Sequence, residues 1–281
     1  MKTRFTRKIL AVTILTAAQL TTASIAAAQA ADEMSEGEFV VPLSNAGRPV
    51  VLEVSAVRGS VSVIGYDGSE VRVAPLEDPQ RLAEDFARNS GGLRRIPNTS
   101  MGLTVEESDN TVSVRLTSGS EDSGVRVTVP RGTSVRARTV NDGNVVVEGV
   151  NGEHELSNTN GDVTASDISG SVVANTTNGD ISVSMTDITP DRAMSFTSFN
   201  GDVEVRLPAS LAADLYITTN RGDILTDFDV ELLPQETIVE RSADGGRYQV
   251  RLESEVRATV GGGGPEVRFK TFNGDIVIRS R

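Results

Sequence analysis

A short motif, Asn-Gly-Asp, recurs in the second half of the chain and limits the folds available to it. It occupies residues 160–162, 178–180, 200–202 and 273–275, and two variants, 141–144 (NDGN) and 220–223 (NRGD), belong to the same series. From residue 141 to residue 220, successive motifs begin 19, 18, 22 and 20 residues apart. A regular interval of this length indicates one supersecondary unit per repeat, stacked on its neighbours.

Aligned on the first Asn of the motif, the repeats carry apolar side chains at alternate positions, as strands with one buried face do. The expected inward positions before the turn are Val135, His154, Val172, Met194 and Val267, followed by Ala137, Leu156, Ala174, Phe196 and Phe269. Those directly after the turn are Val145, Val163, Ile181, Val203, Ile224 and Ile276. Polar or charged residues stand between most of them, so we expect one buried and one solvated face.

Two architectures can use these strands. Asn-Gly is typical of tight turns in antiparallel hairpins, which would give a β-sandwich. Hairpins, however, give no reason for the same residue types to recur at the same position of every repeat. Parallel stacking places like side chains above one another at about 4.8 Å. We therefore predict an all-β parallel β-helix whose rungs are each about 20 residues long, and keep the antiparallel β-sandwich as the alternative.

Two polar columns accompany the motif. Thr139, Asn158, Thr176, Ser198 and Thr271 stand two residues before the turn, where we expect hydrogen bonds between successive members. Asp162, Asp180, Asp202, Asp223 and Asp275 end the motif, with Asn144 in the same slot. We expect these carboxylates to accept amide hydrogens of their own turns. The alternative is that divalent cations such as Ca²⁺ bridge them, and the sequence leaves that question open.

The N-terminus has the layout of a signal peptide over residues 1–30. Four cations, Lys2, Arg4, Arg7 and Lys8, precede an apolar run, and Ala28-Gln29-Ala30 forms an A-x-A cleavage site. The run is shorter than the roughly 20 residues that span a bilayer. We expect a cleaved leader, a flexible segment at 31–37, and a mature protein in the periplasm, on the cell surface or outside the cell, with no membrane span.

Residues 38–281 are expected to form a single β-solenoid domain. The repeats with Asn-Gly-Asp turns cover residues 131–228, and residues 265–281 form the closing rung of the solenoid. Segments 49–75 and 111–130 carry further strands, with Arg58-Gly59-Ser60 in the turn slot. Asp78 and Pro79 begin a predicted helix in an excursion over about 76–100. The least regular part, 229–264, contains a hairpin turn at 244–246 and a flexible glycine run at 261–264.

Four stretches together resemble a known bacterial family, the putative adhesin domain of unknown function, which is built from β-strand repeats. They are VRGSVSVIGYDGSEVRV, VTVPRGTSVRARTVNDGNVVVEGVNG, the repeats with Asn-Gly-Asp turns, and the closing GGGGPEVRFKTFNGDIVIRS. The resemblance extends over nearly all of residues 38–281, although the excursion at 76–100 departs from it. It implies a parallel β-helical fold and an envelope or surface location, and it brings no catalytic residues.

Composition excludes several kinds of chemistry. The chain has no Cys and one His, so thiolate sites, disulfides and multi-histidine zinc sites cannot form. Its net charge of −12 argues against nucleic-acid binding. His154 falls in an inward column, where a buried structural imidazole is expected. Arg221-Gly222-Asp223 spells a cell-attachment tripeptide, but it stands in the slot of the repeated turn.

We expect an exported, non-catalytic envelope or surface protein, an adhesin-like or structural solenoid, and we assign no catalytic, cofactor-binding or metal-binding residues. Its partner would be a surface glycan, an envelope protein, a cationic peptide or another copy of the chain. Phe199, Phe272 and Tyr216 supply contacts. The alternatives are a polysaccharide lyase or hydrolase with Asp180 or Asp202 near Arg206, or an envelope-stress accessory that binds cationic peptides.

Overall fold

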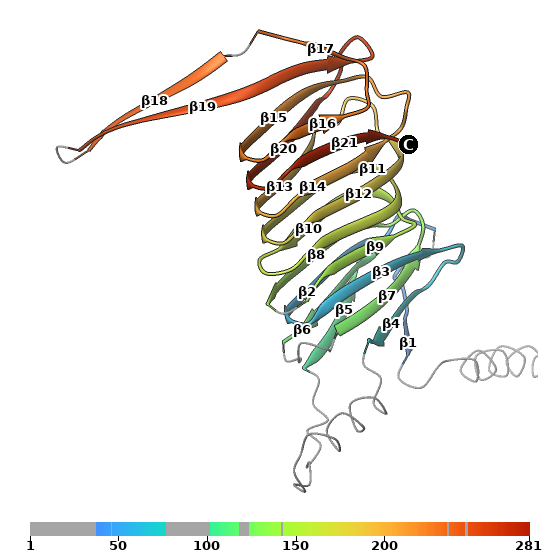
Figure 1. The fold of residues 1–281 in the computed structure, drawn as a ribbon. Coiled ribbons are helices and arrows are strands. Elements are labelled where there is room, and N and C mark those ends of the chain that lie inside the picture. The colour runs from blue at the N-terminus through green and yellow to red at the C-terminus, as the bar shows by residue number, and fades with distance from the viewer. Residues whose placement is uncertain are drawn as a thin grey trace, which may run out of the picture. The chain divides into compact units, whose positions relative to one another are not determined.

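The computed structural model describes residues 38–281 except 46, 77–101, 118–123, 142, 235 and 245–246, and describes residues 236–244 and 247–254 by their backbone (Figure 1). The predicted signal peptide and the segment 31–37 lie outside the described residues. So does the excursion predicted at about 76–100, with its helix beginning at Asp78 and Pro79, apart from Leu76, which follows a strand. Residues 39–281 form one unit with its own core.

Strands stack like rungs in two walls (Figure 1). The first wall consists, in spatial order, of β5 (Leu103–Ser108), β6 (Thr111–Leu116), β2 (Val51–Arg58), β8 (Ser134–Asn141), β10 (Asn151–Asn158), the second half of β11 (Val163–Asn178), β13 (Met194–Asn200), β20 (Glu266–Asn273), β15 (Ala213–Arg221) and β19 (Arg247–Val260).

The second wall consists of β1 (Phe39–Val41), β4 (Val71–Pro75), β7 (Gly124–Pro130), β3 (Ser60–Tyr66), β9 (Val145–Glu148), the first half of β11, β12 (Ile181–Ile188), β14 (Val203–Leu207), β21 (Ile276–Ser280) and β16 (Ile224–Thr226). Two further strands, β17 (Val230–Leu232) and β18 (Glu236–Asp244), pair with β19. The fold is therefore all-β, as predicted, and the described residues contain no helix.

The central rungs have the register that the apolar columns predict. Leu156 lies beside Ala137 on one side and Ala174 on the other, and Phe196 lies beside Ala174 and Phe269, all in parallel pairs. Every residue of the first two predicted inward columns is buried, and the rings of Phe196 and Phe269 stack with centroids 5.3 Å apart. Strands on either side of an Asn-Gly-Asp turn enter different walls, so the hairpin alternative is wrong for these turns.

The ends differ from the uniform parallel stack that we predicted. β5 pairs with β6 in the antiparallel sense, as do β4 with β7, β1 with β4, and β15 with β19. The orientation of the strands is therefore mixed, with a parallel, solenoid-like middle and antiparallel ends. Antiparallel strands at the ends cover backbone edges that would otherwise be free to pair with another chain.

The order of rungs in space differs from their order in the sequence at both ends. The last rung, β20 and β21, lies between the rung of β13 and β14 and the rung of β15 and β16. Similarly, β2 lies between β6 and β8, and β3 lies between β7 and β9. An early pair of strands, β2 and β3, and the last pair, β20 and β21, are thus each enclosed between neighbouring rungs.

Candidate functional site

Each Asn-Gly-Asp corner carries the chain from the first wall to the second, and its glycine is packed against the next corner. Gly201 has φ 148°, and a Cβ built there would lie 2.0 Å from the carbonyl oxygen of Gly179. On Gly274 it would lie 2.1 Å from the carbonyl oxygen of Gly201. Real Cβ atoms do not approach other atoms so closely, so the corners require glycine for their stacking as well as for their backbone angles.

The buried polar column before the corner bonds to these glycines. Thr271 donates its hydroxyl to the carbonyl oxygen of Gly201 at 2.9 Å. The same contact, at 2.9–3.0 Å, joins Thr139 to Gly59, Asn158 to Gly143, Thr176 to Gly161, Ser198 to Gly179 and Thr219 to Gly274. Our expectation of bonds between members of the column was wrong, because the glycine carbonyl of the adjacent corner is the acceptor within reach.

Asparagine side chains at the start of the corner form a ladder. Asn178 donates to Asn160 and Asn200 donates to Asn178, both at 2.9 Å. Asn160 bonds to Asn141 and Asn273 to Asn200 in the same way. Arginine follows at each end of the ladder, because Arg58 is in register with Asn141 and Arg221 with Asn273. The turn variant at 220–223 therefore places its Arg, and not Asn220, in the asparagine position.

Carboxylates at the end of the corner form a second ladder. The amide of Asp202 donates to the carboxylate of Asp180 at 2.8 Å, and the amide of Asp275 donates to Asp202 at 2.8 Å. The acceptor therefore belongs to the adjacent corner, and not to the same turn as we had expected. No group of three or more acidic or histidine side chains among the described residues is arranged to hold a metal ion.

His154 is buried within its column, with 3% of its surface exposed. Its Nε2 lies 3.1 Å from the carbonyl oxygen of Ser169, while Nδ1 is buried without a hydrogen-bond partner. Burial lowers the pKa of the imidazole, and the contacts with backbone groups of Ser169 and Val150 oppose this shift only in part. The side chain therefore behaves as a neutral part of the core, consistent with the structural role that we expected.

The tripeptide 221–223 forms one of the stacked corners. A Cβ on Gly222 would lie 1.9 Å from the carbonyl oxygen of Gly274, and the amide of Asp223 donates to Asp275 at 2.8 Å. The glycine run likewise has a defined path, with positive φ at Gly261, Gly262 and Gly263. It passes close to residues 211–213 and carries the chain from β19 across the end of β15 to β20.

The residues considered for a lyase or hydrolase do not meet. Asp180 and Asp202 belong to the carboxylate ladder at the corner. Arg206 lies further along β14 and is paired with Glu204 of the same strand.

No described helix is long and apolar enough to cross a membrane.

Outside the first wall, solvent-facing side chains form rows that run across the strands. Over the strands from β6 to β15, the two rows nearest the corner contain no Asp or Glu, and none of their side chains is buried. The first outer row comprises Arg115, Ser55, Arg138, Ser157, Asn175, Thr197, Lys270 and Thr218. The second outer row comprises Val57, Val140, Thr159, Thr177, Phe199, Phe272 and Asn220. We call the two rows together the outer strip.

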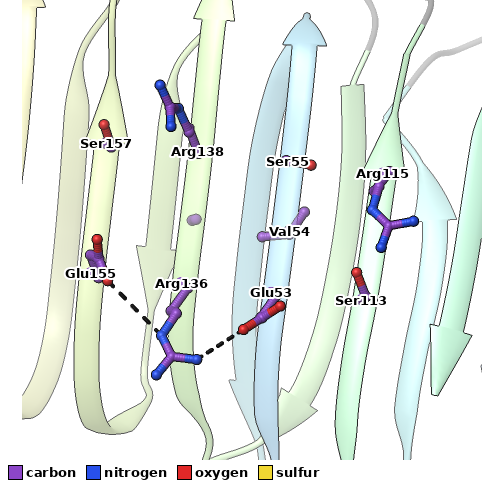
Figure 2. Close-up of a pocket in the computed structure, with 10 residues that line it drawn as sticks. Glu53, Val54, Ser55, Ser113, Arg115, Arg136, Arg138, Glu155 and Ser157 are labelled. Atoms are coloured by element: carbon purple, nitrogen blue, oxygen red, sulfur yellow. Dashed lines mark hydrogen bonds and ion pairs between the residues drawn. The ribbon is translucent and has the colours of Figure 1, made fainter. Parts of the chain in front are cut away.

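One end of the outer strip borders an open groove of about 310 Å³ (Figure 2). In the groove Arg136 pairs with Glu53 at 2.9 Å and lies 3.9 Å from Glu155. Arg115 and Arg138 extend from strands on either side of Ser55 (Figure 2). Arg115 is held by Glu106 at 3.1 Å, while Arg138 has no ion pair with any described residue. The groove therefore offers a guanidinium group to an external anion.

Aromatic and cationic side chains gather at the other end of the strip. The rings of Phe199 and Phe272 stack with centroids 5.0 Å apart and an interplanar angle of 3°, and they are 51% and 36% exposed. The guanidinium of Arg221 lies 5.9 Å from the centroid of Phe272. Beside the strip, Tyr216 lies near Arg268 and Arg257, whose guanidinium carbons are 5.1 and 5.4 Å from its ring centroid.

Sequence reasoning assigned no binding residues and missed the outer strip as a surface. The signal was present, however, because its two rows stand three residues and one residue before the aligned Asn of the central repeats. Phe199 and Phe272 were expected to be exposed, and they are. Tyr216 is half-buried, and its ring lies between two arginines.

Comparison with known proteins finds similarity to a domain family of unknown function. Residues 139–278 match the family described as Toastrack DUF4097. No curated protein matches the sequence. A crystal structure described as a putative cell adhesion protein from Clostridium sporogenes ATCC 15579 aligns with 87% of this chain and 99% of its own, with 11% identity and a TM-score of 0.45. This similarity is too low to carry a conclusion about function.

Proposed function

We propose, starting from the Toastrack match of residues 139–278, that this protein is an exported, non-catalytic envelope or surface protein with a parallel β-helical body. In this proposal the solenoid serves as a rigid support, and the outer strip is the surface that binds a partner. The observation that carries it is the absence of acidic residues from the outer strip in a chain with 39 Asp and Glu against 27 Lys and Arg.

A binding role agrees with how the polar groups of the corners are used. Thr and Asn side chains bond to glycine carbonyls, and aspartate carboxylates accept amides of the next corner. These groups stabilise the stack and do not converge on a common point, whereas catalysis by paired carboxylates needs such a point. The outer strip, in contrast, extends across many rungs and suits an extended partner.

Export rests on the N-terminal sequence, and fractionation tests it. A tagged full-length chain is expected in the envelope or medium with an N-terminus at Ala31. The variant Leu15→Arg places a charge within the apolar run and is expected to hold the unprocessed chain in the cytoplasm. Asp32→Asn, beyond the cleavage site, is the matched control. Recovery of unprocessed wild-type protein from the cytoplasm alone would overturn the proposed location.

A further inference from the structure

We propose that the free edge of β16 binds an extended, basic segment of a partner protein, which adds one strand to the second wall. This surface is separate from the outer strip, which belongs to the first wall. Antiparallel strands extend three of the four wall ends: β5 at one end of the first wall, β19 and β17 at its other end, and β4 and β1 at one end of the second. In the part of the chain that the structure describes, β16 pairs with β21 alone, so the fourth end has no covering strand (Figure 1).

The core is less covered at this end than elsewhere in the second wall. Ile224 belongs to the same inward column as Val203 and Ile276, which are buried, yet it is only half-buried. Thr226, the next inward position of β16, is exposed, whereas Ile278, its neighbour on β21, is buried. One further strand beside β16 would therefore cover core positions that every inner rung already covers.

The backbone of β16 has hydrogen-bonding groups to offer to such a strand. The carbonyl oxygen of Asp223 accepts an amide of β21 at 2.9 Å, and the amide of Asp227 donates to a carbonyl oxygen of β21 at 3.4 Å. Successive residues of a strand direct their backbone groups to opposite edges. Ile224 and Thr226 therefore direct theirs to the free edge, where pairing with an extended peptide is a common mode of recognition.

An apolar side chain of the added strand would find a contact beside Leu225. This side chain is 53% exposed, and it lies next to Val277 on the outer face of the second wall. Both residues line an open groove of about 200 Å³. Residues directly opposite each other in paired strands share a face, so the residue opposite Leu225 is expected to be apolar.

Carboxylates around β16 select a basic segment. Asp223 and Asp227 flank the strand, and Asp229 and Glu231 follow it. All four are exposed, and none has an ion pair with any residue that the structure describes. Arg279, the cation among the residues that line the groove, lies 3.7 Å from a glutamate of β14. Lysine or arginine on either side of the central apolar residue would therefore meet carboxylates that have no cationic partner.

A second copy of this chain fits the edge less well. If β16 paired with itself in the antiparallel sense about Leu225, Asp223 of each copy would lie opposite Asp227 of the other, and like charges directly opposite are destabilising. The N-terminal segment 31–38 of another copy carries four carboxylates and no cation. The charges therefore favour a basic segment of a different protein.

The test uses the mature chain, residues 31–281, and the fluorescently labelled peptide TKVLVKT. Paired antiparallel with β16, the peptide places its leucine opposite Leu225 and its lysines opposite Asp223 and Asp227. We expect fluorescence anisotropy to show binding that weakens as salt is added. TEVLVET is expected to bind at least tenfold more weakly. So is TKVLVKT with both valine nitrogens methylated, because it cannot donate to the backbone of β16.

Thr226→Pro removes the N–H that β16 offers to the added strand, and we expect it to lower the affinity for TKVLVKT at least tenfold. Thr226→Val is the matched control. It also loses the hydroxyl that accepts the amide of Phe228 at 3.1 Å, but it keeps the backbone N–H. We expect it to change the affinity less than twofold.

A second pair of variants tests the charges. Asp223→Asn combined with Asp227→Asn is expected to lower the affinity at least tenfold and to reduce its dependence on salt. Asp162→Asn combined with Asp180→Asn removes the same charge from corners further along the stack, and it is expected to change the affinity less than twofold. Circular dichroism checks that each variant is folded.

Several outcomes would overturn the proposal. They are absence of binding to TKVLVKT, equal binding of TEVLVET or of the methylated peptide, and equal losses in the variants and their controls. A dimer in sedimentation that Thr226→Pro dissociates would overturn it in favour of self-association. The measurements use purified protein, so failure of this proposal and failure of the proposed location are distinguishable.

Discussion

At the scale of single residues, the corner glycines are the positions where substitution is least tolerated. Gly201→Ala would place a Cβ 2.0 Å from a carbonyl oxygen of the next corner, at a φ of 148° that side chains rarely adopt. Backbone must shift in two rungs to relieve the contact. We expect the free energy of unfolding to fall by about 2–4 kcal/mol in urea denaturation.

Gly132→Ala is the control for this substitution. Gly132 lies in an exposed turn, has no positive φ, and a Cβ there would meet nothing within 4 Å. We expect a change of less than about 0.5 kcal/mol. Equal stability of the two variants would show that the close approach of the corners is not a feature of the folded protein.

His154 makes stability depend on pH in a defined direction. Burial holds the pKa of the folded imidazole below its ordinary value of 6.5, so the unfolded chain binds more protons just below that pH. Stability is therefore full above pH 6.5 and declines as pH falls toward the folded pKa, by at most about 1.4 kcal/mol per pH unit. His154→Met, which repeats the residue found at Met194 in the same column, is expected to flatten this decline.

Denaturation between pH 7 and pH 5 measures the effect. The pKa of Glu107 is held below its usual 4.5 mainly by a backbone hydrogen bond from Ser44. Glu107 therefore titrates below this pH range and does not contribute to the change in stability measured within it. The charged groups that line the same pocket as the imidazole form two ion pairs, Glu153 with Arg192 and Glu155 with Arg136, and are present in both proteins. Identical pH profiles for wild type and His154→Met would contradict the assignment.

Which residues are buried could be predicted from the sequence, whereas their hydrogen-bond partners could not. Val135, Phe196 and Phe269 are buried because alternation decides which way a side chain points, and alternation is a local property. The acceptor for Thr271 is Gly201, 70 residues away in the sequence. No local pattern contains that pairing, since it depends on which corner lies next in space.

At the scale of an element, the carboxylate ladder combines a stabilising and a destabilising interaction. Four of the five carboxylates, all but that of Asp223, accept an amide of the next corner, but neighbouring like charges repel by about 1 kcal/mol per pair at 4 Å in water. Asp202→Asn keeps an acceptor oxygen and removes the charge. We expect it to raise stability by about 0.5–1 kcal/mol at low ionic strength, and expect the gain to shrink as salt screens the repulsion.

Asp202→Ala separates the two interactions. It removes the charge and also the acceptor for the amide of Asp275, so we expect it to be less stable than Asp202→Asn by about 0.5–1.5 kcal/mol. In the corner at 141–144 the position equivalent to Asp202 is already an asparagine, Asn144, which accepts the amide of Asp162 at 2.9 Å. Thermal melting at two salt concentrations measures both effects. A gain for Asp202→Ala equal to that for Asp202→Asn would show that the ladder hydrogen bond contributes nothing.

Individual strands were predictable, but their orientation at the ends was not. The hairpin turn expected at 244–246 falls partly on residues 245–246, outside the described residues, but the strands that flank it, β18 and β19, pair in the antiparallel sense up to Asp244 and Arg247. Yet β19 continues to Val260 and pairs with β15 in the antiparallel sense. Alternating residues suit parallel and antiparallel strands equally, so the sequence of β19 could not reveal which neighbour it would cover.

At the scale of the whole described unit, the solenoid is held at each end by a rung that is enclosed by others. The segment of β20 and β21 fits between two rungs that precede it in the sequence, and the glycine run at 261–264 carries the chain to that position. The sequence predicts a rung at 265–281, but not its place. Its apolar columns match those of every other rung, so they fit equally well at several positions in the stack.

This enclosed position has a consequence for truncation. In a repeat array each repeat contacts only its neighbours, so removing a repeat from an end leaves the contacts among the remaining repeats in place. Deleting residues 265–281 here removes the strands that separate β13 from β15 and β14 from β16, and it takes Phe269 away from Phe196. We expect the truncated chain to lose its cooperative thermal transition or to aggregate, whereas Phe272→Ala, which changes the outer face of the same rung, should melt within a few degrees of wild type. A cooperative transition at the wild-type temperature after truncation would mean that the last rung lies at an end of the stack and not within it.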